Sequence, residues 1–571
     1  MRRYIIQYII VALLTTSVFS CSDMLDETVY TFVSGEDLIA NKSYKDLVAG
    51  AYTTLAWHFQ WGNYHNVVNF DCDYQSGPTW AFGALGAGNF YENGDQKNFY
   101  SYYHTAIHRA NYHSFLIDQM DIPENEKNNA MGELAFLKAW AYFNLVQFYG
   151  DVCLYKKSIS DGADLMIPRS PIKDVYEHII ERLIFAEENM YSRKDEKYTK
   201  GHPSKGTATG LLAKVYCTIG SASMPKGNKI TVSGGPGDRL DDDGVTRVRI
   251  PFPAKLTFEK DQVVGYGEFD SKDYYRMGMD KAKKLIDSEE FAIYDSQEEL
   301  WSPSSKNGKE FMFTLQTLPG SEELSHYMAT DYAGNYSEFG HLERGYYLQR
   351  DHWLQMFDQE DERITWGVIH RWPGSYSTTT GLLTWYYYPA RDSVKVRLEQ
   401  DGYQKTDVLS YSSDRYGSKL MKFRQLTVSI DEYRRTDFNF PYMRYAETLL
   451  LYAEADNEIN NGPSAQAIAQ VEKLNKRNNS KTVSELGQSA PWTQETFRSY
   501  ILEERAKEFA AEGIRRFDLL RWGIYLQTMN AIGNTDENNV IKRREARHLL
   551  LPLPENEVNT NKFIEVNNPG W

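Results

Sequence analysis

Apolar residues recur at helical spacing in several stretches of this chain. In one of them, Leu134, Leu137, Ala141 and Leu145 lie on one stripe, and Gly150 ends the pattern. Such spacing predicts amphipathic helices that bury one face. The same pattern recurs at Ala446, Leu449, Leu450 and Ala453, and at Leu502, Ala506, Phe509 and Gly513. Further helices are expected over 37–57, 99–119, 173–190, 206–219 and 272–287.

Small residues and large aromatic residues alternate along these helical stretches. Segments 135–143 and 208–216 both show the alternation. It is similar to tetratricopeptide-type helical hairpins, in which small residues let adjacent helices approach and aromatic rings fill the gaps. The spacing is irregular, so the repeats are degenerate. The chain is therefore predicted to be mostly α-helical, with tetratricopeptide-like hairpins and a few short strands.

Two stretches depart from the helical pattern. Between 221 and 270, a glycine-rich turn at 234–237 precedes an alternating segment at 245–252, which predicts a short strand or hairpin. The stretch 360–430 is irregular, aromatic and polar. Long loops on a helical scaffold are where binding residues commonly lie.

The first residues have the pattern of an export signal. Arg2 and Arg3 precede an apolar run over 5–19, which is shorter than the roughly 20 residues of a spanning helix. Ser20 and Cys21 follow, and they resemble the lipobox of a bacterial lipoprotein. That resemblance implies removal of 1–20 and lipidation of Cys21, with the mature chain held to a membrane by acyl chains. A secreted protein with a free Cys21 is the alternative.

Charge and cysteine content narrow the possible partners. The chain has 63 Lys and Arg against 78 Asp and Glu, a net charge of −15. An acidic surface repels phosphate backbones, so no nucleic-acid partner is expected. Cys72, Cys153 and Cys217 remain once Cys21 is set aside. An odd number at wide spacing predicts neither a disulfide framework nor a zinc site, and we expect three small buried side chains.

No cofactor or metal site is predicted. The acidic turn at 241–244 lacks the closing Glu of a calcium loop. His104, His108 and His113 are expected on one helix, but the companion acid of a His-Glu-x-x-His zinc motif is absent.

Four ordered motifs carry a resemblance to a known family. Segment 132–143 leads into 149–152, 444–458 and 504–523 follow, and the chain closes with 551–557 and 568–571. Together with the lipobox, these motifs resemble the SusD/RagB family of outer-membrane nutrient-binding lipoproteins over nearly the whole mature chain. The Pro-rich end is interpreted as a strap across the helices. Arg516, Asp518 and Arg521 are interpreted as helix-packing residues.

The resemblance implies a mostly α-helical fold of four tetratricopeptide-like hairpins with a loop-rich C-terminal part. It divides the chain into an N-terminal helical region at 21–220, an insertion at 221–270 without a matching family motif, and a C-terminal region at 271–571. It also implies display on the outer face of the outer membrane, a glycan cargo, no enzymatic activity, and a SusC-like TonB-dependent β-barrel as partner.

Aromatic side chains in loops are the candidate ligand contacts. The chain holds 41 Tyr and 12 Trp, many of them beside Gly, Asn and Ser. A sugar ring needs flat apolar platforms and polar groups in the ring plane. Trp80 is the first candidate, with a buried Trp as the alternative, and Trp301 and Trp353 are expected in the core. The candidates are Asp73, Trp80, Phe82 and Tyr91 in the first loop, Tyr332, Asn335 and Tyr336 in the second, and Trp372 and Trp385 in the third.

Three other functions remain open on sequence grounds. A peptide-binding lid of a peptide importer belongs to the same family and is hardly separated from a glycan binder. A glycoside hydrolase needs two carboxylates about 5–10 Å apart, and no acidic pair stands out. A tetratricopeptide scaffold that binds a protein leaves the loop aromatics unexplained.

Overall fold

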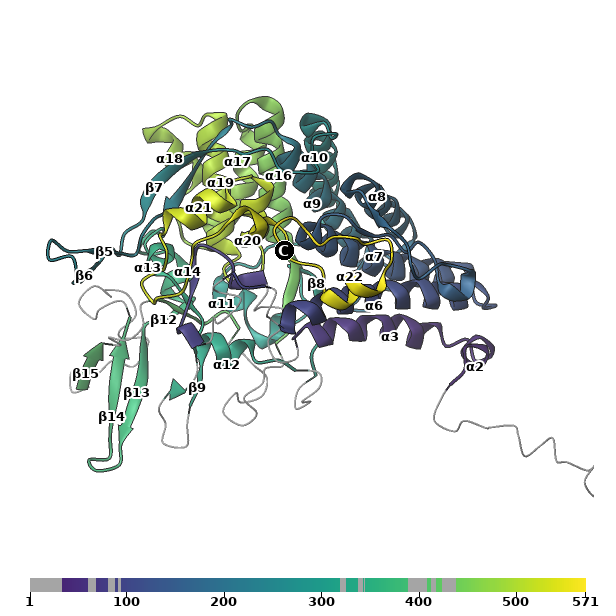
Figure 1. Cartoon of the computed structure of the whole chain (residues 1–571), viewed down its shortest axis with the longest axis horizontal. Coiled ribbons are helices and arrows are strands. Elements are labelled where there is room, and N and C mark those ends of the chain that lie inside the picture. Colours follow the sequence, from purple (N-terminus) through teal and green to yellow (C-terminus); the bar gives the residue numbers. More distant parts are fainter. Residues whose placement is uncertain are drawn as a thin grey trace, which may run out of the picture.

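The computed structural model describes residues 33–59, 68–80, 88–90, 94–318, 325–336, 342–343, 345–388, 408–411, 417–423 and 438–571. Successive long helices pack as pairs, and each pair also contacts the next (Figure 1). The prediction of a mostly α fold built from helical hairpins is confirmed. The pairs are α3 (Tyr44–Phe59) with α6 (Gly94–Asp118), α7 (Glu124–Tyr149) with α8 (Ile172–Asn189), α9 (Lys205–Ser223) with α10 (Ser271–Ser288), and α16 (Tyr445–Asn460) with α17 (Ala465–Arg477).

Shorter elements complete the fold around this helical array. Within the described residues, no helix combines the length and apolarity needed to cross a bilayer. The other helices are α2 (Gly35–Ala40), α11 (Gln297–Leu300), α12 (Met328–Ala333), α13 (Asp351–Leu354), α14 (Glu362–Thr365), α18 (Val483–Ser489), α19 (Gln494–Glu508), α20 (Arg515–Arg521), α21 (Tyr525–Ala531) and α22 (Glu555–Thr560). The paired strands include β1 (Gln75–Ser76) with β11 (Leu348–Gln349), β2 (Val152–Cys153) with β3 (Arg169–Ser170), β8 (Phe311–Thr314) with β17 (Pro441–Arg444), β9 (Asn335–Tyr336) with β10 (Leu342–Glu343), β12 (Val368–Ile369) with β16 (Lys419–Leu420), and the sheet of β13 (Arg371–Ser377), β14 (Leu382–Tyr387) and β15 (Val408–Tyr411).

The central helix α7 shows how sequence sets one element. It lies against both α6 and α8, so it is buried on nearly every side from Leu134 onward. Gly150 ends the helix with a φ of +71°, a conformation that side chains with a Cβ rarely adopt. A Cβ at this position would also lie 3.1 Å from a Leu550 methyl group, which would have to shift by a few tenths of an ångström.

Two predicted helices differ from the structure in where they end. The stretch 37–57 is two helices, because Lys42 takes a left-handed φ of +54° between α2 and α3. The helix predicted from the apolar stripe that reaches Gly513 also ends earlier than expected. Helix α19 stops at Glu508, Phe509 is its C-cap, and Ala511 has a φ of +61°. Apolar spacing indicates which residues are buried. Because burial continues past the end of a helix, the spacing does not identify the capping residue.

The 221–270 segment contains a two-part antiparallel ribbon whose outer part projects from the body (Figure 1). Strand β4 (Lys229–Gly234) pairs with β7 (Ala254–Glu259), and β5 (Asp238–Leu240) pairs with β6 (Arg247–Arg249). The strand expected within 245–252 is β6. At 241–244, the carboxylate of Asp243 accepts hydrogen bonds from the backbone of Val245 and Thr246, as in an ordinary acidic turn.

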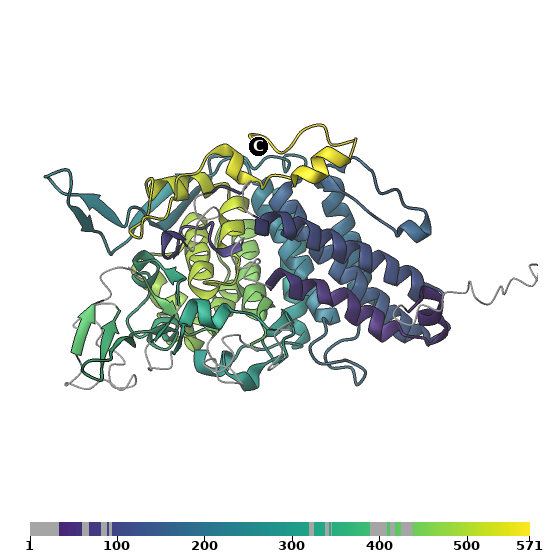
Figure 2. The same ribbon diagram turned by 60° about the horizontal axis from the view of Figure 1, so that its bottom comes forward.

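The expected core residues are confirmed. Trp301 and Trp353 are buried, as are the three free cysteines Cys72, Cys153 and Cys217. The C-terminal strap lies across the helices, as Figure 2 shows in yellow. Its backbone and side chains bond to the end of α7: the Leu551 N–H donates to the Phe148 carbonyl at 2.7 Å, and the Asn568 amide donates to the Tyr149 carbonyl at 3.0 Å.

A buried ion-pair network joins the C-terminal elements. Arg444 Nη1 lies 2.9 Å from Glu508 Oε1, and Arg477 Nη2 lies 2.6 Å from the same oxygen. Arg444 also bonds to Glu310 at 2.7 Å and to Glu512 at 2.8 Å. Burial alone would raise the pKa of Glu508, but the surrounding arginines hold it well below its usual range. The carboxylate therefore stays charged in the interior.

Replacing Glu508 by glutamine is expected to lower the free energy of unfolding by about 3–5 kcal/mol, because the arginines lose a buried counter-charge. Urea unfolding followed by circular dichroism measures the loss. Glu268→Gln is the matched control, since Glu268 pairs with Lys173 on the exposed surface.

The destabilisation caused by Glu508→Gln should become smaller as the pH falls. A carboxylate with a lowered folded-state pKa stabilises the fold above its unfolded-state pKa of about 4.3, and that contribution is lost as the pH falls toward the folded-state value. The difference in the free energy of unfolding between wild type and Glu508→Gln should therefore become smaller in acid. Equal free energies of unfolding for the two proteins at neutral pH would contradict the assigned role of Glu508.

Candidate functional site

Two of the three candidate loops meet through a short strand pair. Strand β1, directly after Tyr74, pairs antiparallel with β11, so Gln75 lies opposite Gln349 and Ser76 opposite Leu348. The side-chain oxygen of Gln75 accepts hydrogen bonds from the Gln349 amide at 2.7 Å and from the Tyr332 hydroxyl at 3.4 Å. The fold thus brings the first loop onto the second, although they are far apart in sequence.

An exposed aromatic pair lies beside this junction. Trp80 is 65% exposed, and its ring packs edge-on against Tyr346 with ring centroids 4.6 Å apart. Tyr346 is partly buried, so it supports the tryptophan from the protein side. An exposed indole held by a second ring presents a fixed apolar face to solvent.

The third candidate loop approaches the same place through Lys419. The Lys419 ammonium donates to the carbonyl oxygen of Gly345, the residue before Tyr346. The same ammonium lies 5.6 Å from the centroid of the Trp372 ring, in a cation–π contact. Segments around Trp80, Tyr346 and Trp372 therefore gather on one region of the molecule.

Interior arginines hold the base of the first loop. Asp73 accepts from Arg515 Nε at 2.8 Å and Nη2 at 2.7 Å, a two-point ion pair that is buried. Asp71 pairs with Arg516 and with Arg544. Burial alone would raise the pKa of Asp71, and the two guanidinium groups lower it below its usual value. Both carboxylates attach the loop to the C-terminal region.

The structure separates the candidate contacts into three groups. Asp73, Tyr332 and Trp372 are buried, and their side chains contact other protein groups. Asn335 and Tyr336 form β9, and Trp385 lies in β14 opposite Pro373. Trp80 alone is described as exposed, while Phe82 and Tyr91 lie outside the described residues.

Sequence reasoning missed the partners of Trp80 and Trp372. Tyr346 lies within the second candidate loop and follows a glycine, so loop chemistry could have selected it. Lys419 and Gln75 carry no such signal, since their importance arises from contacts between distant segments.

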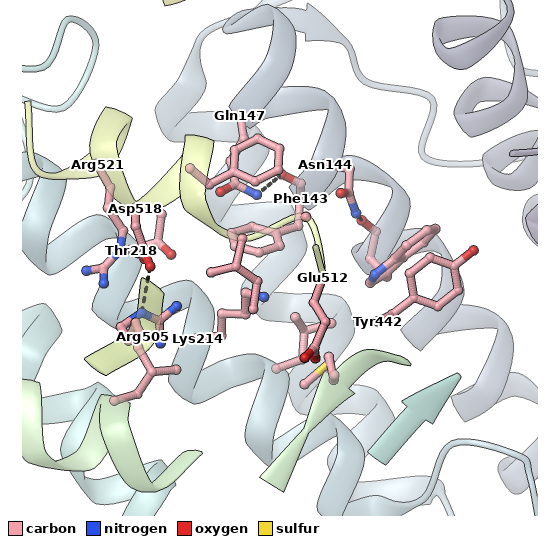
Figure 3. A pocket seen from close by; sticks show the side chains of 17 residues that line it. Phe143, Asn144, Gln147, Lys214, Thr218, Tyr442, Arg505, Glu512, Asp518 and Arg521 are labelled. Carbon is pink, nitrogen blue, oxygen red and sulfur yellow. Dashed lines mark hydrogen bonds and ion pairs between the residues drawn. The ribbon is translucent and has the colours of Figure 1, made fainter. Parts of the chain in front are cut away.

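A small interior cavity lies among the family-like motif residues (Figure 3). Its volume is about 40 Å³, enough for a water molecule and too small for a sugar ring. Arg505 and Arg521 lie on either side of Asp518, with Nε–Oδ distances of 2.8 and 2.9 Å, and they lower its pKa against the effect of burial. These motif residues join α20 to its neighbours. Within the described residues, no group of three or more His, Cys, Asp and Glu side chains is arranged to hold a metal ion.

Comparisons with known proteins agree with the helical architecture. The sequence profile of the SusD family matches residues 303–571, and a profile described as starch-binding and associating with the outer membrane matches 22–217. Two SusD-like proteins of Formosa agariphila are 23% and 21% identical and align over 100% and 98% of both chains. The chain belongs to the SusD/RagB family.

Solved structures of SusD-type proteins share the fold. A SusD homologue from Bacteroides thetaiotaomicron superposes with a TM-score of 0.70 at 19% identity, covering 93% of this chain and 97% of the other. Surface glycan-binding protein A from Bacteroides fluxus gives a TM-score of 0.64 at 18% identity, covering 93% and 99%. A structure with a bound xylogluco-oligosaccharide gives 0.63 at 17% identity, covering 91% and 98%.

The support role of Asp73 in this SusD/RagB protein can be tested by Asp73→Asn. Removing the charge leaves Arg515 buried beside a neutral group, and the free energy of unfolding should fall by about 3–5 kcal/mol. Urea unfolding measures the change, with Asp243→Asn on the exposed turn as the matched control. Unaltered stability together with lost ligand affinity would instead make Asp73 a ligand contact.

Proposed function

We propose that this protein binds glycans at the surface that carries Trp80 and does so without catalysis. The observation that carries the proposal is the exposed Trp80 ring, which Tyr346 holds at the meeting point of the three loops. The C–H face of a sugar ring stacks on such a platform, and nearby polar groups would select its hydroxyls.

Relatives support a carbohydrate ligand. One matching family profile is described as starch-binding, one similar structure holds a xylogluco-oligosaccharide, and another is called a surface glycan-binding protein. We extend this ligand class to the present chain. The binding step would concentrate a glycan at the cell surface, and a transporter would then carry it inward.

The partner and the location form the second part of the proposal. The Cys21 lipobox and a family profile that mentions outer-membrane association support a lipid-anchored protein on the outer face of the outer membrane. A SusC-like TonB-dependent β-barrel would receive the glycan. Two or more acyl chains on Cys21 would give stable anchoring, since one chain binds a membrane only weakly.

Affinity electrophoresis of the chain from Ser22 to Trp571 tests the binding. Gels that contain a panel of plant and algal polysaccharides should retard the protein with at least one of them. Trp80→Ala should lower the affinity about tenfold, which corresponds to the roughly 1.4 kcal/mol of a lost stacking platform. Phe252→Ala is the matched control, because Phe252 is also 65% exposed but lies on the projecting ribbon.

The outcomes separate the function from the site. Equal retardation of wild type and Trp80→Ala would show that the glycan does not bind at Trp80. No retardation by any polysaccharide, with no heat signal for oligosaccharides in calorimetry, would reject glycan binding. Release of reducing sugar by the purified protein would reject the non-catalytic part.

The anchor predicts a simple change in location. Cys21→Ser removes the thiol that would be lipidated, so the protein should leave the membrane fraction and appear in the soluble fraction. Ser22→Ala is the matched control and should stay with the membrane. A membrane-bound Cys21→Ser protein would contradict lipidation at Cys21.

A further inference from the structure

A broad groove opens between helices α10 and α17 over the first turn of α16, and we refer to it as the α10–α17 groove. Helix α16 contacts both of the other helices and lies between them (Figure 1). The volume of the groove is about 860 Å³, which is within the range of ligand pockets. None of its lining residues belongs to the proposed glycan site around Trp80, so the groove is a separate space.

The floor of the groove is aromatic and fixed to the core. The rings of Phe291 and Tyr445 are stacked, with centroids 6.2 Å apart and an angle of 24° between their planes. Both segments bond to Glu310 of the buried ion-pair network. The Tyr445 N–H donates to the Glu310 carbonyl at 2.9 Å, and the Tyr294 N–H donates to Glu310 Oε2 at 3.2 Å. A floor held in this way needs little ordering when a ligand binds.

The two walls of the groove carry opposite charges. Lys473 and Lys476 lie about one turn apart on α17, and both are exposed. Neither lysine side chain has an ion pair or a hydrogen bond within the part of the chain that the structure describes. Asp287 and Glu289 at the end of α10 form the acidic wall, and only Asp287 is paired, with Lys283 at 2.6 Å, among the described residues. A ligand that spans the groove would therefore find counter-charges on both sides.

The hydroxyl of Tyr445 is an unused hydrogen-bonding group at the floor. The residue is only 5% exposed, and its hydroxyl bonds to none of the described residues. Its oxygen remains accessible from the groove that the residue lines. Burial raises the pKa of Tyr445 to about 12, and the charges of Asp287 and Glu289 add to the rise. The hydroxyl therefore keeps its proton and can donate it to a carbonyl oxygen.

This mixture of groups selects one class of ligand. A phosphate or an acidic sugar would be repelled by Asp287 and Glu289, and a neutral sugar would leave both walls without counter-charges. A polypeptide segment supplies side chains of both charges, a carbonyl oxygen for Tyr445, and apolar groups for the partly exposed Ile286 and Ile293. Each wall has charges at two positions, more than the single ammonium and single carboxylate of a free peptide's termini can pair with. The lining therefore favours an internal segment.

We propose that the α10–α17 groove docks an internal segment of a partner protein, which carries a basic and an acidic side chain on either side of an apolar residue. The basic side chain would pair with Glu289, and the acidic one with Lys473 and Lys476. A backbone carbonyl of the segment would accept the hydrogen bond of the Tyr445 hydroxyl. This docking does not depend on glycan binding at Trp80.

Selection from a phage-displayed library of random peptides tests the proposal, with the chain from Ser22 to Trp571 immobilised as the target. The enriched peptides should combine Lys or Arg with Asp or Glu around an apolar residue. They are then synthesised with acetylated and amidated ends, and their affinity is measured by fluorescence anisotropy. Binding should persist with the blocked ends and should weaken as salt is added, because salt screens exposed charge pairs.

Two variants locate the peptide in the groove. Lys473→Glu combined with Lys476→Glu should weaken the blocked peptide at least tenfold, because two attractions become repulsions. Both side chains are exposed, so this protein should fold. Lys226→Glu combined with Lys272→Glu is the matched control, since it changes the net charge equally at exposed positions outside the groove. Tyr445→Phe should weaken the peptide about fivefold through the loss of one hydrogen bond.

Several results would overturn the proposal. They are a selection without enriched peptides, enriched peptides without the mixed charges, and equal affinity of the double lysine variant and its control. Binding that requires free peptide ends would make the groove a site for free peptides instead of a docking site. Trp80→Ala should bind the enriched peptide like wild type, so the docking proposal and the glycan proposal fail separately.

Discussion

The burial of charge in matched pairs is the constraint on which the fold depends. An arginine can lie in a protein interior only when carboxylates and carbonyl oxygens replace the water that it loses. Arg444 meets this condition with Glu310, Glu508 and Glu512. These partners come from the approach to β8, the end of α19 and the loop beyond it. A displacement of any one of these elements would break a buried ion pair, so the pairs favour one arrangement of the C-terminal half.

The same principle attaches the surface loops to the helical array. Asp71 and Asp73 lie near the start of the chain, but their arginine partners lie near its end. These ion pairs therefore attach the loop between α3 and α6 to the C-terminal region. The same loop carries Trp80, which lies at the surface. The tryptophan is positioned by buried charges. This arrangement separates the residues that shape the proposed binding surface from Trp80, which is exposed on it.

Charged side chains around the small interior cavity pair with one another's counter-charges. Around the small interior cavity, Arg505 and Arg521 both pair with Asp518, and these buried ion pairs stabilise the fold. Titratable side chains near a cavity thus do not by themselves mark a ligand site.

Helical segments, core tryptophans and buried cysteines could be predicted from the chain alone, because each depends on local spacing or on the hydrophobicity of one side chain. The 134–148 stripe and Gly150 identified α7, and ordered motifs identified the family. Loop composition also selected the three regions that converge on the surface. It could not separate exposed Trp80 from buried Tyr332 and Trp372, because burial depends on contacts between segments far apart in sequence. Helix ends at Ala40 and Glu508 were missed for a related reason, since backbone conformation near a helix end leaves the apolar pattern unchanged. The pairing of Asp73 with Arg515 was decided by tertiary packing, which alone brings distant side chains within bonding distance or keeps them apart.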